Sequence, residues 1–266
     1  MLKNFKIFFA LTFFYSTLIH GSEILIQSTT STRDSGFYEF LLPKYPSYQN
    51  INIKVVAVGT GQAIKNAENC DADLLIVHDY QKEINFMKNN FGIRRDDLMY
   101  NDYVLIGPST DPAEINDSSS IISSFGKIAR SKHKFISRSD SSGTYSFEMS
   151  IWDKVKINPA DDSGGWYLET GQGMGPSLNI AVATGSYILS DRSTWVTFKN
   201  KQDHIILYEN PVELANNYGI ILVNPEHCPT ANYESSLSLY NWLISDAVKI
   251  IINSFTVNDQ QIFYTR

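Results

Sequence analysis

Apolar and polar positions alternate along this chain with two different periods, and the period changes many times. Short apolar runs indicate strands at residues 24–26, 53–58, 72–77, 186–189, 204–208 and 218–223. Apolar residues at helical spacing indicate helices at residues 37–45, 63–69, 79–88, 121–131, 147–155 and within 231–255. Pro43 is expected to bend or end the first of these helices. The alternation of strands with helices predicts the α/β class with mostly parallel sheets.

Two predicted strands are candidates for carrying the chain between two lobes. One covers residues 99–108, starts with polar residues and ends in Gly-Pro, and the other begins at residue 218. We therefore expect a first lobe made of residues 23–103 and 218–266 and a second lobe made of residues 104–217. A ligand would then lie in the cleft between the lobes, where pockets are often found.

Turns rich in hydrogen-bond donors occur where several predicted strands lead into helices. Five consecutive hydroxyl residues lie within 27–36, residues 59–62 read Gly-Thr-Gly-Gln, and residues 138–144 read Arg-Ser-Asp-Ser-Ser-Gly-Thr. A further turn, 170–175, reads Thr-Gly-Gln-Gly-Met-Gly. Free amides at a helix start and the planar Arg138 guanidinium both bind anions, and open α/β sheets bind ligands at such strand ends. The turns together predict an anion site, although each alone is consistent with a loop and a helix cap, with Ser141 or Ser142 as the cap after Arg138.

The turn at residues 59–62 fits neither of the common nucleotide-binding motifs. A dinucleotide fingerprint needs a third glycine where this chain has Ile64. A P-loop needs Ser or Thr after its lysine, and Lys65 is followed by Asn66. What remains is a turn that offers backbone amides and one hydroxyl at a helix start.

Residues 1–22 have the pattern of a secretory signal peptide. Lys3 and Lys6 precede an apolar run, and Gly21 or Ser22 supplies a small residue for cleavage. No cysteine lies near the cut to carry a lipid anchor, and no later stretch is long and apolar enough to span a membrane. We therefore expect an exported, soluble protein, periplasmic where the cell has two membranes.

Charge and cysteine content narrow the class of partner. The formal charge is −6, and loss of Lys3 and Lys6 would make it −8, since 20 basic side chains would face 28 acidic ones. Such a balance argues against nucleic-acid binding. Cys70 and Cys228 show no zinc-ligand spacing with histidine. An exported pair can form a disulfide, but separation along the chain does not decide whether these two are close.

Six motifs, in this order, give the chain a resemblance to the extracytoplasmic tungstate-binding proteins of ABC importers, which have the type II periplasmic-binding-protein fold. They lie at residues 28–36, 56–63, 99–102, 138–144, 167–175 and 191–195, and the resemblance covers nearly the whole mature chain. Ser28, Cys70 and Ser193 depart from the residues usual in that family, which are Thr, Gly and Gly. None of these departures lies in the 138–144 stretch.

The resemblance implies that a tungstate oxyanion binds between the lobes, with no direct bond from protein to tungsten, no cofactor and no catalytic residue. Carried over position by position, the implied oxyanion-binding residues are Thr29, Thr30, Ser31, Thr60, Gly61, Arg138, Ser142, Gly143, Thr144, Thr170 and Gly171. Thr30, Arg138 and Thr144 are foremost among them. The turn with Thr170 and Gly171 would close the site or, equally well, cap a helix. The implied partner is the membrane permease of an ABC importer, and the protein is expected to be a monomer.

Three questions remain open at the level of the sequence. The first is the anion, because molybdate matches tungstate in size and charge, and phosphate or sulfate could bind to the same fold. A phosphate site benefits from a carboxylate facing the proton of the anion, and the sequence does not show whether Asp34 and Asp140 face the ligand. The second is a secreted serine hydrolase with Ser142 or Thr144 as nucleophile, which the lack of a Gly-x-Ser-x-Gly motif disfavours. The third is His78, expected to be a structural hydrogen-bonding residue at a strand end.

Overall fold

The computed structural model of the protein describes residues 22–266. The expected signal peptide therefore lies outside the described residues, apart from Ser22, which opens the first strand. Within residues 22–266, none of the helices combines the length and the apolar character that crossing a membrane requires.

Strands and helices alternate along most of the chain, as the hydrophobic pattern predicts. The strands are β1 (Ser22–Thr29), β2 (Ile51–Val58), β3 (Leu74–Val77), β4 (Gly92–Pro108), β5 (Phe135–Ser137), β6 (Tyr167–Glu169), β7 (Tyr187–Asp191), β8 (His204–Glu209), β9 (Ala215–Val223), β10 (Thr256–Val257) and β11 (Gln260–Gln261). The helices are α1 (Thr30–Asp34), α2 (Phe37–Leu41), α3 (Thr60–Glu68), α4 (Tyr80–Lys88), α5 (Ile121–Ser131), α6 (Gly143–Val155), α7 (Met174–Thr184), α8 (Arg192–Thr197), α9 (Tyr233–Leu243) and α10 (Asp246–Asn253). Helix α2 ends just before a 3₁₀ turn that contains Pro43, as expected.

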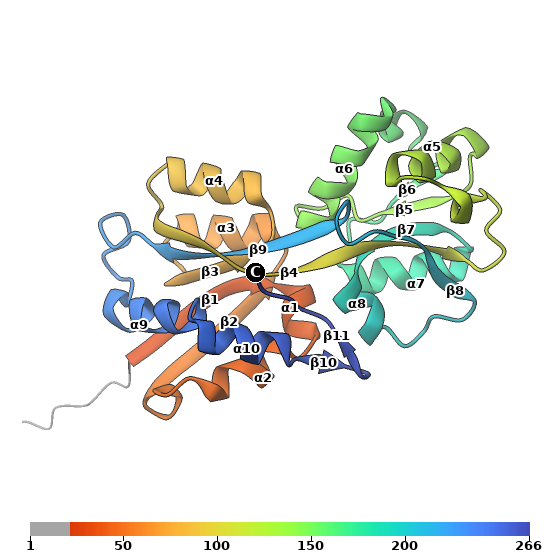
Figure 1. Cartoon of the computed structure of the whole chain (residues 1–266). Helices are drawn as coiled ribbons and strands as arrows, with labels where there is room; N and C mark the ends of the chain where they lie inside the picture. The colour runs from red at the N-terminus through yellow and green to blue at the C-terminus, as the bar shows by residue number, and fades with distance from the viewer. Residues whose placement is uncertain (1–21) are drawn as a thin grey trace, which may run out of the picture.

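The strands form two lobes that share one long strand (Figure 1). In the first lobe, β2, β1 and β3 are parallel, and β9 runs antiparallel between β3 and β4. In the second lobe, β7, β5 and β6 are parallel, while β4 is antiparallel to both β7 and β8. Strand β4 pairs with β9 as far as Asp102 and with β7 from Tyr103 onward, so it passes from one lobe into the other. The sheets are thus mixed, and their antiparallel members include the strands that connect the lobes.

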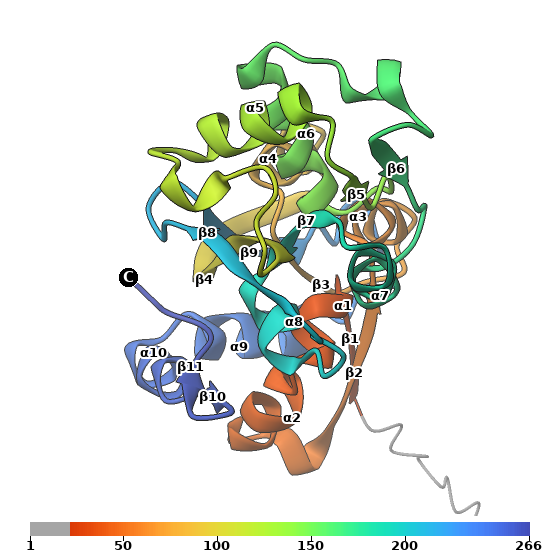
Figure 2. The ribbon, with the colours of Figure 1, turned by 90° about the vertical axis from the view of Figure 1, so that its right-hand side faces the viewer.

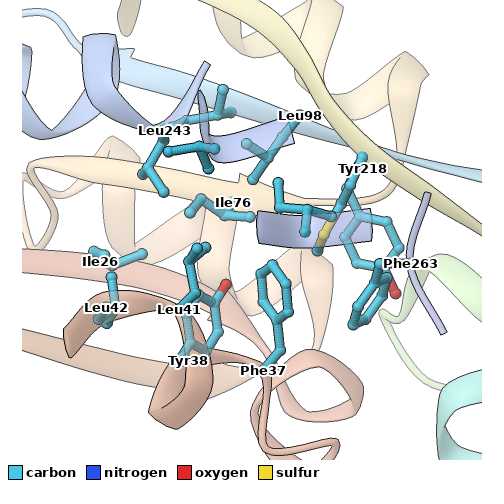
Figure 3. Close-up of a cluster of buried hydrophobic side chains, with 14 of the residues drawn as sticks. Ile26, Phe37, Tyr38, Leu41, Leu42, Ile76, Leu98, Tyr218, Leu243 and Phe263 are labelled. Atoms are coloured by element: carbon cyan, nitrogen blue, oxygen red, sulfur yellow. The ribbon is translucent and has the colours of Figure 1, made fainter. Parts of the chain in front are cut away.

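Helices cover both faces of each sheet, and side chains on alternate positions of a strand enter different cores. On β4, Tyr103 and Leu105 pack with α5 and α6, whereas Val104 and Ile106 pack with α7 and α8. In the first lobe, α3 and α4 cover one face, and α2, α9 and α10 cover the other. Figure 3 shows the second of these cores, in which side chains from β1, β3, α2 and the C-terminal segment point toward one another.

Contact between the lobes is not confined to the connecting strands. Helix α8 of the second lobe lies beside α1 of the first (Figure 2). Val196 of α8 packs into the core that α2, α9 and α10 cover, although it belongs to the other lobe by sequence. The division of the chain at residues 103 and 218 remains a prediction.

Strand β4 begins earlier than the predicted start at residue 99. Its first part contains four consecutive charged residues, Arg94, Arg95, Asp96 and Asp97. Because these residues interrupt the apolar pattern, the sequence did not indicate a strand there. The charge of Arg95 is matched inside the fold, because its guanidinium donates to the buried carboxylate of Glu83 at 2.9 Å. The hairpin β10–β11 was likewise not predicted, since its strands are two residues long.

Cys70 and Cys228, whose pairing the sequence left open, form a disulfide with a Cα–Cα distance of 5.2 Å. The bond joins the turn after α3 to the loop that follows β9, and these segments are separated by 158 residues. Cys70 has a backbone φ of 66°, in the left-handed region that favours glycine. Both cysteines belong to the first lobe, so the bond ties its N-terminal part to its C-terminal part.

Candidate oxyanion-binding site

Three donor-rich turns meet where the two lobes face each other. The turns after β1 and β2 are neighbours because these strands are paired in parallel up to Thr29 and Val58. The turn after β5 belongs to the other lobe, and it reaches them through a hydrogen bond from the Gly61 amide to the Ser141 carbonyl at 2.9 Å. Parallel strands present their carboxyl ends at one edge of a sheet, which explains why turns distant in sequence are brought together.

Arg138 is the central cation of this region and is 5% exposed. Its Nε and Nη2 atoms donate to Oδ2 of Asp140 at 3.2 and 2.6 Å. The other oxygen of Asp140 accepts the Ser142 amide at 3.0 Å. Within residues 22–266, Nη1 of Arg138 has no acceptor, so the guanidinium is held from one side and keeps donors for a ligand.

Helix α6 begins at Gly143, five residues after Arg138, and its first amides lie near the same turn. Ser142 is the N-cap, and its Oγ accepts the Tyr145 amide at 3.2 Å. Of the two serines that the sequence offered for this cap, Ser141 is exposed and does not serve. The amides of Gly143 and Thr144 occupy the first turn, where a helix leaves N–H groups without acceptors, and both residues are buried. This helix start is therefore a buried group of donors next to a guanidinium.

The first lobe contributes hydroxyl groups. Thr60 is the first residue of α3 and is 1% exposed, and in the described part of the chain its buried Oγ1 has no hydrogen-bond partner. A buried hydroxyl without a partner is costly, and such groups generally have a ligand or water as acceptor. Oγ1 of Thr29 bonds to the hydroxyls of Thr32 at 2.9 Å and Ser31 at 3.4 Å. Thr30 is partly exposed at the start of α1.

The carboxylates in these turns are all occupied. Asp34 is exposed and accepts the Arg33 guanidinium at 2.7 Å. Asp140 is bonded through both oxygens, as described above. Asp191, the N-cap of α8, accepts the Thr194 amide and also the Thr194 hydroxyl. Asp140 is thus fully engaged within its own turn, whereas Asp34 is exposed and bonded through Oδ1 alone.

His78 has the structural role expected for it, at the end of β3. Its ring is buried, and Nδ1 lies 2.9 Å from Oδ1 of Asn216 and 3.2 Å from the Tyr103 hydroxyl. Burial lowers the pKa of His78 to about 4; the nearby charge of Asp191 opposes this decrease, and the charge of Arg138 adds to it. The ring is therefore neutral near pH 7, and Nδ1 donates to the Asn216 carbonyl oxygen.

The turn with Thr170 and Gly171 lies beside the end of β5, next to Arg138, and Thr170 bonds within the second lobe. The Thr170 hydroxyl donates to the Ser137 carbonyl at 3.1 Å and lies 2.8 Å from Oγ of Ser177. Gly171 is exposed and has a φ of 61°. Of the two predicted roles, this geometry favours the turn before helix α7, and a direct contact with an anion remains a prediction.

Glu148 is a supporting residue that the sequence analysis missed. It is 2% exposed on α6, and its carboxyl oxygens accept from Ser137, Trp152 and Tyr167 at 3.1, 3.1 and 2.7 Å. Burial raises the pKa of Glu148 to about 7. By bonding the last residue of β5, it holds the strand end from which Arg138 projects. The sequence contained a signal for this role, because Glu148 lies four positions before Trp152 on an apolar helix face.

Two α/β lobes with donors converging between them define a class of ligand-binding protein. Residues 19–247 match the model of the PBP superfamily domain, and the chain belongs to this superfamily. The α/β binding-protein fold expected from the hydrophobic pattern and the motifs is thereby confirmed.

Within the superfamily, the chain is similar to tungstate-binding proteins. It is 37% identical over 234 residues to the tungstate-binding protein TupA of Peptoclostridium acidaminophilum, covering 87% of this chain and 81% of that protein. The structure of the tungstate-binding protein TupA from Desulfovibrio alaskensis is 36% identical, with a TM-score of 0.79 and coverage of 91% of this chain and 98% of that one. A solved tungstate ABC transporter structure from Geobacter sulfurreducens is 38% identical, with a TM-score of 0.79 over 88% of this chain and 98% of that one. The resemblance drawn from the motifs is confirmed.

Proposed function

We propose that the protein binds tungstate between its lobes and delivers it to the permease of an ABC importer. The observation that carries this proposal is the buried set of donors without acceptors: the Thr60 hydroxyl, the first amides of α6 and the free edge of Arg138. Relatives over nearly the full length are named as tungstate-binding proteins, which supports tungstate as the particular anion.

The proposed ligand matches this donor set in chemistry. A tetrahedral dianion offers four acceptor oxygens and needs no acceptor from the protein. In our proposal the anion contacts Thr29, Thr30, Ser31 and Thr60 on the first lobe and Arg138, Ser142, Gly143 and Thr144 on the second. All of these contacts go to oxygen atoms, and no side chain coordinates tungsten. Because donors come from both lobes, the anion stabilises the closed arrangement by contacts that an open one lacks.

Occupied carboxylates favour a fully deprotonated anion over phosphate. Phosphate carries a proton for much of the population near neutral pH, and that proton needs an acceptor. Asp140 is bonded through both oxygens to Arg138 and the Ser142 amide, and Asp34 is exposed and paired with Arg33, so in our proposal neither accepts that proton. Molybdate has nearly the same size and charge as tungstate. It would fit the same donors equally well and is therefore the alternative ligand.

The surroundings of the protein follow from the same proposal. The signal peptide at residues 1–22 would export the chain to the periplasm, where it acts as a monomer and meets the permease. No cofactor is required for this role.

Melting temperatures in the presence of different oxyanions test the proposed ligand. Tungstate at about 100 times its dissociation constant should add about 2.7 kcal/mol to the free energy of unfolding, and molybdate should act similarly. Phosphate and sulfate at millimolar concentration should have little effect. If phosphate stabilises the protein as strongly as tungstate, the proposal fails in favour of a phosphate-binding protein. Turnover of generic ester or phosphoester substrates would instead support the hydrolase alternative.

Tungstate affinity is expected to be nearly constant from about pH 6.5 to about pH 8.5. Neither an arginine nor hydroxyl donors titrate in this range. His78, the histidine whose pKa responds to the charge of Arg138, has its pKa lowered to about 4 by burial and stays neutral throughout. Calorimetric titrations at several pH values measure this directly. Glu148, whose pKa burial raises to about 7, titrates in this range but bonds Ser137 and not the anion. A steep change in affinity would therefore show either that its protonation is coupled to binding or that another titrating group contacts the anion.

A further inference from the structure

Gly61 and Ser141 form a backbone contact between the lobes, directly beside the donor turns. The Gly61 amide at the start of α3 donates to the carbonyl of Ser141, which precedes α6 in the other lobe, at 2.9 Å. A Cβ atom added to Gly61 would lie 2.7 Å from Cβ of Ser141 and 2.9 Å from its carbonyl oxygen. Real Cβ atoms do not approach other atoms this closely, so a larger residue would force the two turns apart.

The need for glycine at position 61 is steric and arises only between the lobes. Gly61 lies within helix α3 and has no positive φ, so alanine can adopt its backbone conformation. Gly59, two residues earlier in the same turn, provides a contrast, because its nearest neighbour would be the Ser142 nitrogen at 4.0 Å. Two glycines of one turn therefore face the same loop, and only one of them is in tight contact with it.

A second contact joins the lobes close to the first. Nζ of Lys82 on α4 donates to Oγ of Ser146 on α6 at 2.8 Å, and Lys82 also pairs with Asp79. Cavities of about 390 and 540 Å³ lie beside this contact, and Lys82 and Ser146 line both. The lobes therefore touch at separate points, with open space around them, and of these two contacts the Gly61–Ser141 contact is the one made through backbone atoms.

We propose that Gly61 is a positioning residue for lobe closure, whose contact with Ser141 sets how long a bound anion is retained. This inference rests on the proposed function. The Gly61 amide already donates to the Ser141 carbonyl, so Gly61 affects anion binding indirectly, by stabilising the closed arrangement of the lobes. A contact present only in the closed state stabilises that state and raises the apparent affinity of any ligand that binds there.

Gly61→Ala and its matched control Gly59→Ala test the proposal. The first should lower tungstate affinity about tenfold to a hundredfold, mainly through faster dissociation, because overpacking must be relieved by separating the lobes. The second should leave affinity and dissociation rate within about twofold of the original chain. Adding Ser141→Gly to Gly61→Ala removes the Cβ contact while leaving the carbonyl, and should restore part of the lost affinity. Equal effects of the two alanine variants, or no restoration, would overturn the proposal.

A readout that needs no anion separates this inference from the proposed function. Spin labels at Lys88→Cys and Lys154→Cys would report the distance between α4 and α6, which stand on the same side of the two lobes (Figure 1). Gly61→Ala should shift the distribution of distances between the labels toward longer distances, because the lobes separate. Gly59→Ala should leave the distribution unchanged. If the labelled chain binds no oxyanion but still shows this difference, the proposed function fails and the closure contact stands. If no closed population exists with or without tungstate, the closure contact is wrong.

Discussion

Replacement of Arg138 by lysine is expected to weaken tungstate binding about tenfold to a hundredfold while the protein remains folded. Lysine keeps the positive charge but has no planar fork, so it cannot reproduce the two bonds from Nε and Nη2 to Asp140 while presenting a separate nitrogen to the anion. The lost charge-assisted hydrogen bond is worth about 1.5–3 kcal/mol. Isothermal calorimetry measures the loss, and circular dichroism checks the fold.

Arg33→Lys is the matched control for this substitution. Arg33 also lies in a donor-rich turn and also pairs with a nearby aspartate, but its side chain is 46% exposed. The control variant should bind tungstate with nearly unchanged affinity. Arg138→Lys with the affinity of the original chain would remove Arg138 from the binding site.

Loss of the Cys70–Cys228 disulfide is expected to lower the free energy of unfolding by about 2–5 kcal/mol. The bond closes a loop of 158 residues, and constraint of the unfolded chain grows with loop length. Urea denaturation of the oxidised protein, the thiol-reduced protein and the Cys70→Ala/Cys228→Ala variant measures the change. Reduced protein as stable as the oxidised form would contradict this expectation.

Glycine in place of Cys70 should recover part of the lost stability. The left-handed φ of 66° at this position is strained for alanine and not for glycine. Cys70→Gly/Cys228→Ala should therefore be more stable than the double alanine variant by about 1 kcal/mol. Identical stabilities of the two variants would show that the backbone at this position relaxes when the bond is absent.

The sequence predicted those helices and strands whose apolar pattern is visible within the element itself. Strand β3 is a continuous apolar run and β7 begins with one, and both lie close to their predicted positions. The first part of β4 was missed because its arginines find partners such as Glu83, which lies on another element. Pairing of Cys70 with Cys228 could not be predicted because it depends on how α3 and the loop after β9 come together.

Prediction of the binding site was also limited by contacts between elements that are distant in the sequence. Turns at the ends of parallel strands can be recognised from the sequence, because strand direction determines which ends meet. Which donors remain available cannot be recognised, since that depends on contacts made across the fold. Gly61 and Thr170 illustrate the limit: each has the expected donor, and each donates to a carbonyl of the other lobe or of a neighbouring strand.

The connection between the lobes has a mechanical consequence. Strands β4 and β9 remain hydrogen-bonded to each other as far as Asp102 and Ala215, and the Tyr103 amide still donates to the Leu214 carbonyl at 2.8 Å. A hydrogen-bonded pair of strands resists stretching and sliding, because either motion breaks the ladder, whereas bending and twisting preserve it. The pair therefore acts as an elastic hinge. The energy needed to bend it contributes to the free energy of opening and closing the cleft around a ligand.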